Sequence, residues 1–159
     1  MRDAAGLAPR LRTADLREIA ANVGEDPLSV LERGVAWSDP CYVIVDGEER
    51  PLALFGVVPD ADCADAGLVW LLGSEELVRH SFFVLRNSRT WIERLHQRYK
   101  VLWNYVDARN EVHIRWLKWC GFDFLRLVEQ HGAEQRPFYE FRKVRDDNDA
   151  SPEPTAAGA

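Results

Sequence analysis

The stretch VLWNYVDARNEVHIRWLKWCGF, residues 101–122, decides the fold of this 159-residue chain. Its first six residues are mostly β-branched or aromatic, which predicts a strand. Residues 111–119 predict a short helix, because Gly121 follows them and glycine is favoured just beyond a helix end. A polar loop joins the two and ends at Asn110, eleven residues before Gly121. The stretch therefore predicts a strand, a loop and a helix in succession.

The residues before this stretch predict another strand and a long helix. Residues 67–72 form an apolar run of strand length. From residue 84 to residue 99, apolar positions recur every three or four residues, as in a helix with one buried face. We expect Trp91 and Leu95 to lie on that face, against the sheet. Because strand, helix and strand follow one another, the two strands are predicted to be parallel and joined by a right-handed crossover.

Further elements are predicted on both sides of this unit. Residues 41–45 and 51–58 read as a hairpin, and residues 122–128 and 138–144 as a second pair of strands. Two helices come first, one with the apolar stripe Leu16, Ile19 and Ala20, and one over residues 27–35. The predicted fold class is α/β, with a mixed, mostly antiparallel sheet, a central parallel strand pair and helices on both faces.

Composition and charge restrict the organisation and the function. Residues 1–145 are expected to form a single domain, and residues 146–159 a disordered acidic tail rich in Pro and Ala. The net charge of −6 argues against nucleic-acid binding, and no apolar run reaches transmembrane length. The first residues are too polar for a signal peptide, so a cytoplasmic protein is expected. The three cysteines lack metal-ligand spacing, and no metal site is expected.

One segment has the opposite charge from the rest. Residues 79–118 carry nine Arg and Lys against three acidic residues. Such a block indicates either a local anionic ligand or a solvated helix face.

The element order, together with residues 101–122, resembles the GCN5-related N-acetyltransferase (GNAT) family. In that family a loop Asn and a helix ending in Gly-Phe have the spacing shown here by Asn110, Gly121 and Phe122. More narrowly, residues 116–122 look like a small group of tailed-phage proteins described as acetyltransferase-like, some of which are internal virion proteins. The resemblance implies acetyl transfer from acetyl-CoA to a small or protein-borne primary amine, in the cytoplasm of an infected bacterial host.

The resemblance also implies a place for the cofactor. In the family, the pantetheine arm lies in a gap between the two parallel strands and pairs with the open backbone of the first. Here this implies binding by Leu71, Leu72 and Gly73, with an N–H of Leu72 or a neighbour polarising the carbonyl. Asn110 is then a rim residue of the cofactor site or only a helix cap.

Two features differ from the family pattern. The glycine-rich loop that binds pyrophosphate before the long helix is absent, since Gly73 stands alone. Leu117 occupies the position of the Tyr that protonates the leaving thiolate in many members, which leaves Tyr105 and Tyr139 as candidate proton donors.

Basic side chains near the start of the long helix offer a replacement for the missing loop. Arg79, Arg86 and Arg89 can bind phosphates through their guanidinium groups, or they can form a solvated or partner-binding face. The sequence therefore leaves two functions open. One is an acetyltransferase, and the other is a non-catalytic phage virion or host-interaction protein that keeps the fold.

Overall fold

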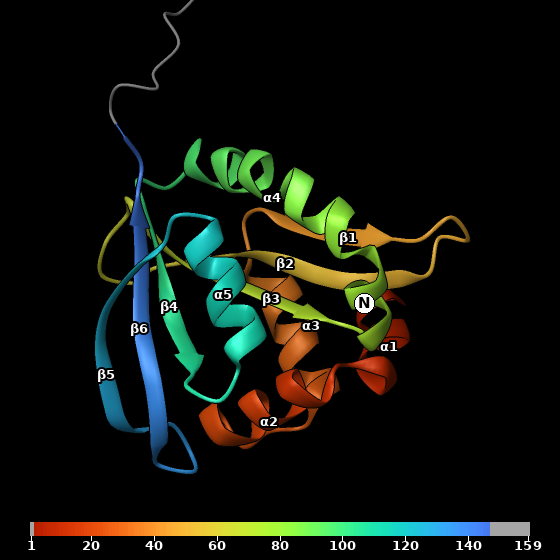
Figure 1. The fold of residues 1–159 in the computed structure, drawn as a ribbon, viewed down its shortest axis with the longest axis horizontal. Helices are drawn as coiled ribbons and strands as arrows, with labels where there is room; N and C mark the ends of the chain where they lie inside the picture. The colour runs from red at the N-terminus through yellow and green to blue at the C-terminus, as the bar shows by residue number, and fades with distance from the viewer. Residues whose placement is uncertain (1, 147–159) are drawn as a thin grey trace, which may run out of the picture.

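The computed structural model describes residues 2–146, which form a mixed sheet with helices on both sides (Figure 1). The elements, in chain order, are α1 (Arg2–Leu7), η1 (Ala8–Arg10), α2 (Thr13–Asn22), α3 (Pro27–Trp37), β1 (Cys41–Val45), β2 (Pro51–Pro59), β3 (Ala66–Gly73), η2 (Glu75–His80), α4 (Ser81–His96), β4 (Val101–Asp107), α5 (Glu111–Trp119), β5 (Asp123–His131) and β6 (Arg136–Val144). The strand order is β1-β2-β3-β4-β6-β5. Strands β3 and β4 are parallel, and all other neighbours are antiparallel. The predicted fold class is confirmed.

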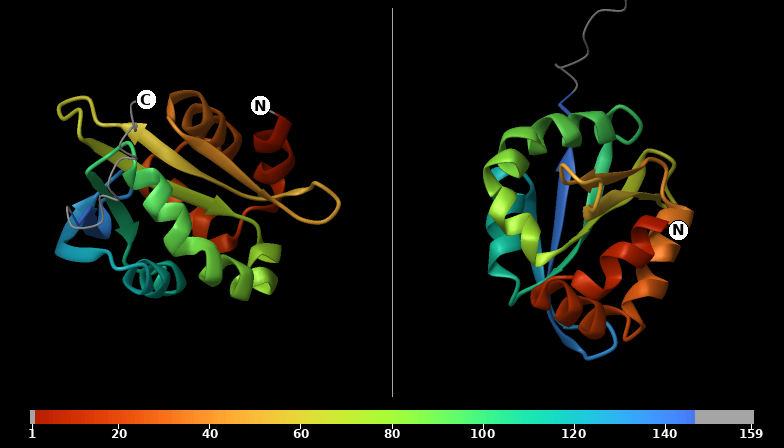
Figure 2. Two further views of the ribbon diagram at one scale, coloured as in Figure 1. Left: turned by 90° about the horizontal axis from the view of Figure 1, so that it is seen from above. Right: turned by 90° about the vertical axis from the view of Figure 1, so that its right-hand side faces the viewer.

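Each face of the sheet has its own apolar core. Helices α1, α2 and α3 cover one face, and α4 and α5 cover the other (Figure 2). The first face buries Leu7, Ile19, Leu31 and Leu54 in one cluster. The second buries Ile92, Leu95, Leu102, Leu117 and Phe141 in another. The central strands β3 and β4 therefore lie between two helical layers.

Helix α4 has the predicted buried face. Leu95 is 1% exposed, and the ring of Trp91 lies 5.3 Å from that of Phe55 on β2. Both side chains therefore face the sheet, as predicted. The turn η2, which runs directly into α4, has no counterpart among the predicted elements.

The predicted apolar stripe of α2 is wrong in part. Ile19 is buried as predicted, but Leu16 and Ala20 are exposed and Asp15 is 1% exposed. The carboxylate of Asp15 is buried because Arg12 Nη2 donates to it at 2.6 Å and the N–H of Gly73 donates to it at 2.8 Å. Polar contacts thus rotate the helix away from its most apolar arrangement.

The domain boundaries stay a prediction. The predicted tail, residues 146–159, lies outside the described residues except for residue 146.

Candidate functional site

Strands β3 and β4 pair over three residues and then separate. The paired positions are Ala66 with Val101, Gly67 with Leu102 and Leu68 with Trp103. Beyond them β3 stays paired with β2 as far as Gly73, and β4 stays paired with β6 as far as Asp107. The centre of the sheet therefore has an opening between residues 69–73 and residues 104–107.

The side chain of Asn104 lies where the strands separate. Its Nδ2 donates to the carbonyl of Val69 at 2.9 Å, and its Oδ1 accepts from the N–H of Tyr105 at 2.8 Å. In a continued parallel ladder, that N–H and that carbonyl would bond each other directly. Asn104 satisfies both groups and so acts as a wedge between the strands.

Leu71 has free backbone groups at this opening. Successive residues of a strand direct their N–H and C=O to opposite neighbours, so Val69, Leu71 and Gly73 face the opening and Leu72 faces β2. The carbonyl of Gly73 accepts from the N–H of Arg12 at 2.9 Å, and its N–H donates to Asp15. No residue between 2 and 146 pairs with Leu71 across the opening. Leu71 therefore presents one donor and one acceptor to a ligand.

A cavity of about 210 Å³ passes through the opening and reaches both faces of the sheet. We call it the gap cavity. On the α2–α3 side it is bordered by Glu18, Trp37, Trp70 and Tyr105. On the α4–α5 side it is bordered by Ser88, Trp116 and Leu117. Leu71 and Leu72 lie between the two sides.

The carboxyl group of Glu18 borders the gap cavity and has a raised pKa. Its Oε2 accepts from Asn110 Nδ2 at 2.9 Å and from the N–H of Asp107 at 3.4 Å. Burial raises the pKa of Glu18 to about 7, and the nearby charge of Asp15 adds to the rise, although the Asn110 hydrogen bond opposes it. A carboxyl group that titrates near neutral pH is suited to general acid–base chemistry.

Asn110 positions Glu18 and begins α5. It is the N-cap residue, and its Oδ1 accepts from the N–H of His113 at 3.4 Å. Since its Nδ2 is bonded to Glu18, both ends of the amide have protein partners. The loop between β4 and α5 thus connects the motif residue Asn110 to a carboxylate on α2.

His113 is a buried polar group without a complete set of partners. Its Nδ1 has no hydrogen-bond partner among the described residues. Burial lowers the pKa of His113 to about 3, and the charge of Arg12 contributes, so the imidazole is neutral. His113 borders the gap cavity and also the second hollow of the protein. The imidazole therefore belongs to the lining that the two hollows share.

The second hollow, of about 340 Å³, lies between η2, α4 and α5. We call it the α4–α5 groove. Its lining is largely apolar and includes Leu71, Leu77, Val78, Leu85, Val112 and Trp119. It shares Leu71, His113 and Trp116 with the gap cavity. The two hollows therefore meet beside the free backbone groups of Leu71.

The turn η2 fills the place of a phosphate-binding loop. The N–H of Ser81, where α4 begins, is already bonded to the carbonyl of Val78. The side chain of Leu77 lies so close to Gly73 that a Cβ there would come within 2.7 Å of it. The start of α4 therefore lacks the open backbone that binds anions at other helix N-termini.

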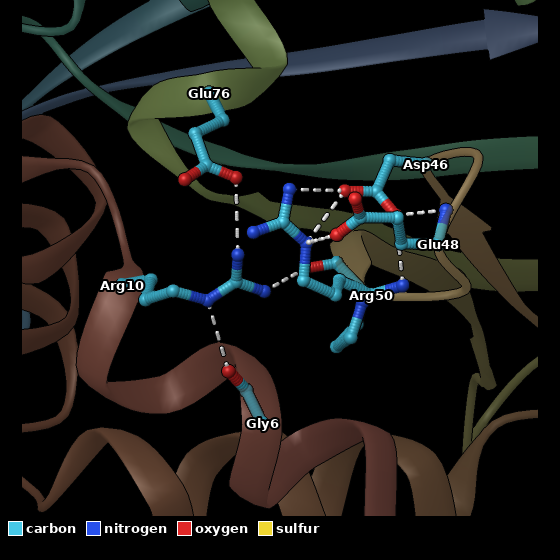
Figure 3. Close-up of polar contacts among 7 residues, drawn as sticks. Gly6, Arg10, Asp46, Glu48, Arg50 and Glu76 are labelled. Atoms are coloured by element: carbon cyan, nitrogen blue, oxygen red, sulfur yellow. Dashed lines mark hydrogen bonds and ion pairs between the residues drawn. The ribbon is translucent and has the colours of Figure 1, made fainter.

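The acidic residues of η2 point toward the N-terminal segment. Glu75 accepts from the N–H of Thr13 at 2.9 Å, and Glu76 forms an ion pair with Arg10 at 3.1 Å (Figure 3). The predicted phosphate ligands Arg79 and Arg86 are exposed and border neither hollow. The guanidinium group of Arg89 lies 4.6 Å from the ring centre of Trp119, at the edge of the α4–α5 groove.

The two candidate tyrosines lie in different places. Tyr105 borders the gap cavity, with its ring centre 4.3 Å from that of His131. Tyr139 packs against Phe124, at a ring distance of 5.8 Å, and borders neither hollow. Leu71, Leu72 and Tyr105 therefore all line the gap cavity, and Tyr139 lies apart from them. The predicted N–H donor of Leu72 faces β2, so Leu71 takes its place at the opening.

Glu18, Asn104 and His113 are site residues that the sequence analysis did not identify. A single Glu in an amphipathic helix gives no signal of burial. Asn104 gives a weak one, because Asn is disfavoured within strands and here interrupts an apolar run.

Within residues 2–146, no three His, Cys, Asp or Glu side chains are arranged to hold a metal ion. In the same part of the chain, no helix is long and apolar enough to cross a membrane.

Solved structures with a similar fold are acetyltransferases. A GNAT-family acetyltransferase of Bacillus anthracis superposes with a TM-score of 0.65 at 9% identity, covering 90% of this chain and 89% of its own. A Bacillus subtilis acetyltransferase in complex with CoA gives 0.59 at 10% identity, covering 74% and 83%. A variant of the Vibrio cholerae spermidine N-acetyltransferase gives 0.56 at 9% identity, covering 65% of this chain and 64% of its own.

No family model and no curated protein matches this sequence. At such low identities the superpositions show the fold alone, so the chain has the GNAT fold.

Proposed function

We propose that this chain is an N-acetyltransferase that transfers an acetyl group from acetyl-CoA to a primary amine. The observation that carries the proposal is the opening between β3 and β4. There the free N–H and C=O of Leu71 and the carboxyl group of Glu18 border one cavity.

The residues at the opening fit the pantetheine part of acetyl-CoA. Free strand groups pair readily with the amides of an extended ligand, and Leu71 supplies both a donor and an acceptor. Leu72 and Gly73 follow Leu71 on the strand, but the backbone of Gly73 is already bonded to Arg12 and Asp15. The apolar walls of the α4–α5 groove suit the alkyl segments of the arm.

Arginine side chains can bind the phosphates of CoA in place of a glycine-rich loop. We propose Arg79 and Arg86, which are exposed near the start of α4, as the phosphate ligands. Asn110 is proposed to act on the site through Glu18, because its amide is bonded to that carboxyl group.

The roles of the protein groups follow from their positions. Bound acetyl-CoA supplies the thioester carbonyl that the amine attacks. The N–H of Leu71 donates to the carbonyl oxygen as negative charge develops on it. Glu18 accepts the proton that the amine nitrogen loses as the new C–N bond forms. Neutral His113 hydrogen-bonds the leaving sulfur, and Tyr105 is the proposed proton donor to it.

A second function is favoured by a different observation. The segment around Arg12 and Asp15 occupies the backbone of Gly73, and η2 occupies the place of the phosphate loop. Both features fit a non-catalytic phage virion or host-interaction protein that has kept the fold. In either case we propose a phage-encoded protein that acts in the cytoplasm of the bacterial host.

Calorimetric titration with acetyl-CoA and desulfo-CoA separates the two functions. The enzyme is expected to bind both with micromolar affinity and to release CoA when spermidine or a peptide amine is added. Glu18→Gln is expected to keep the binding and lose the release, whereas Glu129→Gln, an exposed change on β5, leaves both unaltered. Absence of binding at millimolar concentrations would contradict acetyl-CoA as the donor and support the non-catalytic function.

A further inference from the structure

The rim of the α4–α5 groove is apolar and exposed to water. Val78, Leu85, Val112 and Trp119 line the groove, and each is at least 40% exposed. Phe82, on the first turn of α4, is 77% exposed. Several large apolar side chains exposed around one groove are unfavourable in water and are typical of a contact with another macromolecule.

Basic side chains border the same rim. Arg89 lies over the ring of Trp119, and Arg115 lines the groove from α5. The nearby acid Glu76 is paired with Arg10 (Figure 3). Glu75 accepts from the N–H of Thr13, so neither acid is bonded to Arg89 or Arg115. The rim therefore presents positive charge around an apolar centre, which complements an acidic partner.

Free CoA is expected to find only side-chain ligands for its phosphates at this rim. Its nucleotide end carries several negative charges, for which the start of α4 offers no open backbone because η2 continues into the helix. A pantetheine arm attached to a protein carries a single phosphate. The surface of that protein can also cover the apolar rim.

We propose that the natural acyl donor is a thioester on the phosphopantetheine arm of an acidic carrier protein, which docks on the rim of the α4–α5 groove. The inference rests on the proposed function, because the groove leads to the free backbone groups of Leu71. The arm passes along the groove, and the carrier contacts Phe82 and Trp119 while its acids face Arg89 and Arg115. The transfer is unchanged: the thioester C–S bond breaks, the C–N bond forms and the carrier keeps the thiol.

The test compares two donors with one acceptor amine, acetyl-CoA and an acetylated bacterial acyl carrier protein. The kcat/KM is expected to be at least tenfold higher for the carrier and to fall steeply with added salt. Phe82→Ser and Arg115→Glu are expected to lower kcat/KM for the carrier by tenfold or more and for acetyl-CoA by less than threefold. The matched controls, Leu125→Ser on β5 and Arg2→Glu on α1, change exposed residues away from the groove and leave both donors unaffected.

The outcomes distinguish this inference from the proposed function. Turnover with acetyl-CoA but not with the carrier overturns the inference and leaves the function intact. Equal losses for both donors in Arg115→Glu also overturn it, because the arginine then binds the phosphates of CoA. If neither donor reacts, binding of the carrier with its arm, measured by fluorescence anisotropy, still tests the docking. Its loss in Phe82→Ser supports the inference, and equal binding in that variant overturns it.

Discussion

Strand β4 is bonded along its whole length to β6 but over only three residues to β3. On the β6 side, Phe138 and Phe141 are buried and close the layer. On the β3 side, the polar wedge Asn104 interrupts the ladder and a cavity follows. The comparison shows how one strand can serve two purposes. The closed side stabilises the fold, and the open side gives up backbone hydrogen bonds that a ligand can then make.

The largest effect is expected on the open side. Glu18→Gln should reduce the rate of acetyl transfer by about 10²–10⁴-fold, because the proton acceptor is lost. In the wild type, a base with a pKa of about 7 makes kcat/KM rise with pH up to about 7 and then level off. The variant should lack that inflection in a pH–rate profile. An inflection that persists near pH 7 in Glu18→Gln would assign it to another group.

On the closed side, the expected effect is on folding. Phe141→Ala should lower the free energy of unfolding by about 3–5 kcal/mol, since it leaves a cavity in the core shared with Leu95 and Leu117. Denaturant unfolding followed by circular dichroism measures the change. A loss below about 1 kcal/mol would show that the closed side contributes less than its burial indicates.

At the junction of the two hollows, His113→Leu should alter the dependence of stability on pH. The neutral His113 has a folded pKa of about 3, so the unfolded chain binds the proton more readily between pH 3 and about 6.5. Wild-type stability therefore falls as the pH drops through this window. The variant lacks this contribution. Between pH 8 and pH 5, the free energy of unfolding of the wild type should therefore fall by about 1–2 kcal/mol more than that of the variant. Thermal unfolding at the two pH values provides the measurement, and parallel changes in both proteins would contradict the assignment.

The smallest effect is expected at the wedge itself. Asn104→Ala removes the partners of the Val69 carbonyl and the Tyr105 N–H, which should cost about 1–2 kcal/mol of stability. The control Asn87→Ala removes a side-chain bond to a carbonyl within α4 and should cost less, because Ala favours helices. An Asn104→Ala protein as stable as the wild type would indicate that β3 and β4 pair further along when the wedge is absent.

Local patterns predicted the strands and helices better than the polar contacts at the opening. Residues 67–72 form an apolar run and residues 84–99 have a helical repeat, so the parallel pair and its crossover follow from the sequence. Asp15 and Glu18 look like solvated acids on a helix, and their burial depends on Gly73 and Asn110, 58 and 92 residues further along the chain. Such long-range polar contacts leave no periodic signal. The helix η2 was missed for a similar reason, since a 3₁₀ helix of six residues is too short to show a clear repeat.

Two amides at the end of β3 should respond differently to a bound ligand in a hydrogen–deuterium exchange experiment. The amide of Gly73 is bonded to the buried carboxylate of Asp15, whereas the amide of Leu71, two residues earlier, faces the opening without a partner. In deuterated water the first amide is protected whether or not the site is filled, and the second is protected only when a ligand pairs with it. One peptide that contains both amides therefore carries the signal of occupancy together with its own internal reference.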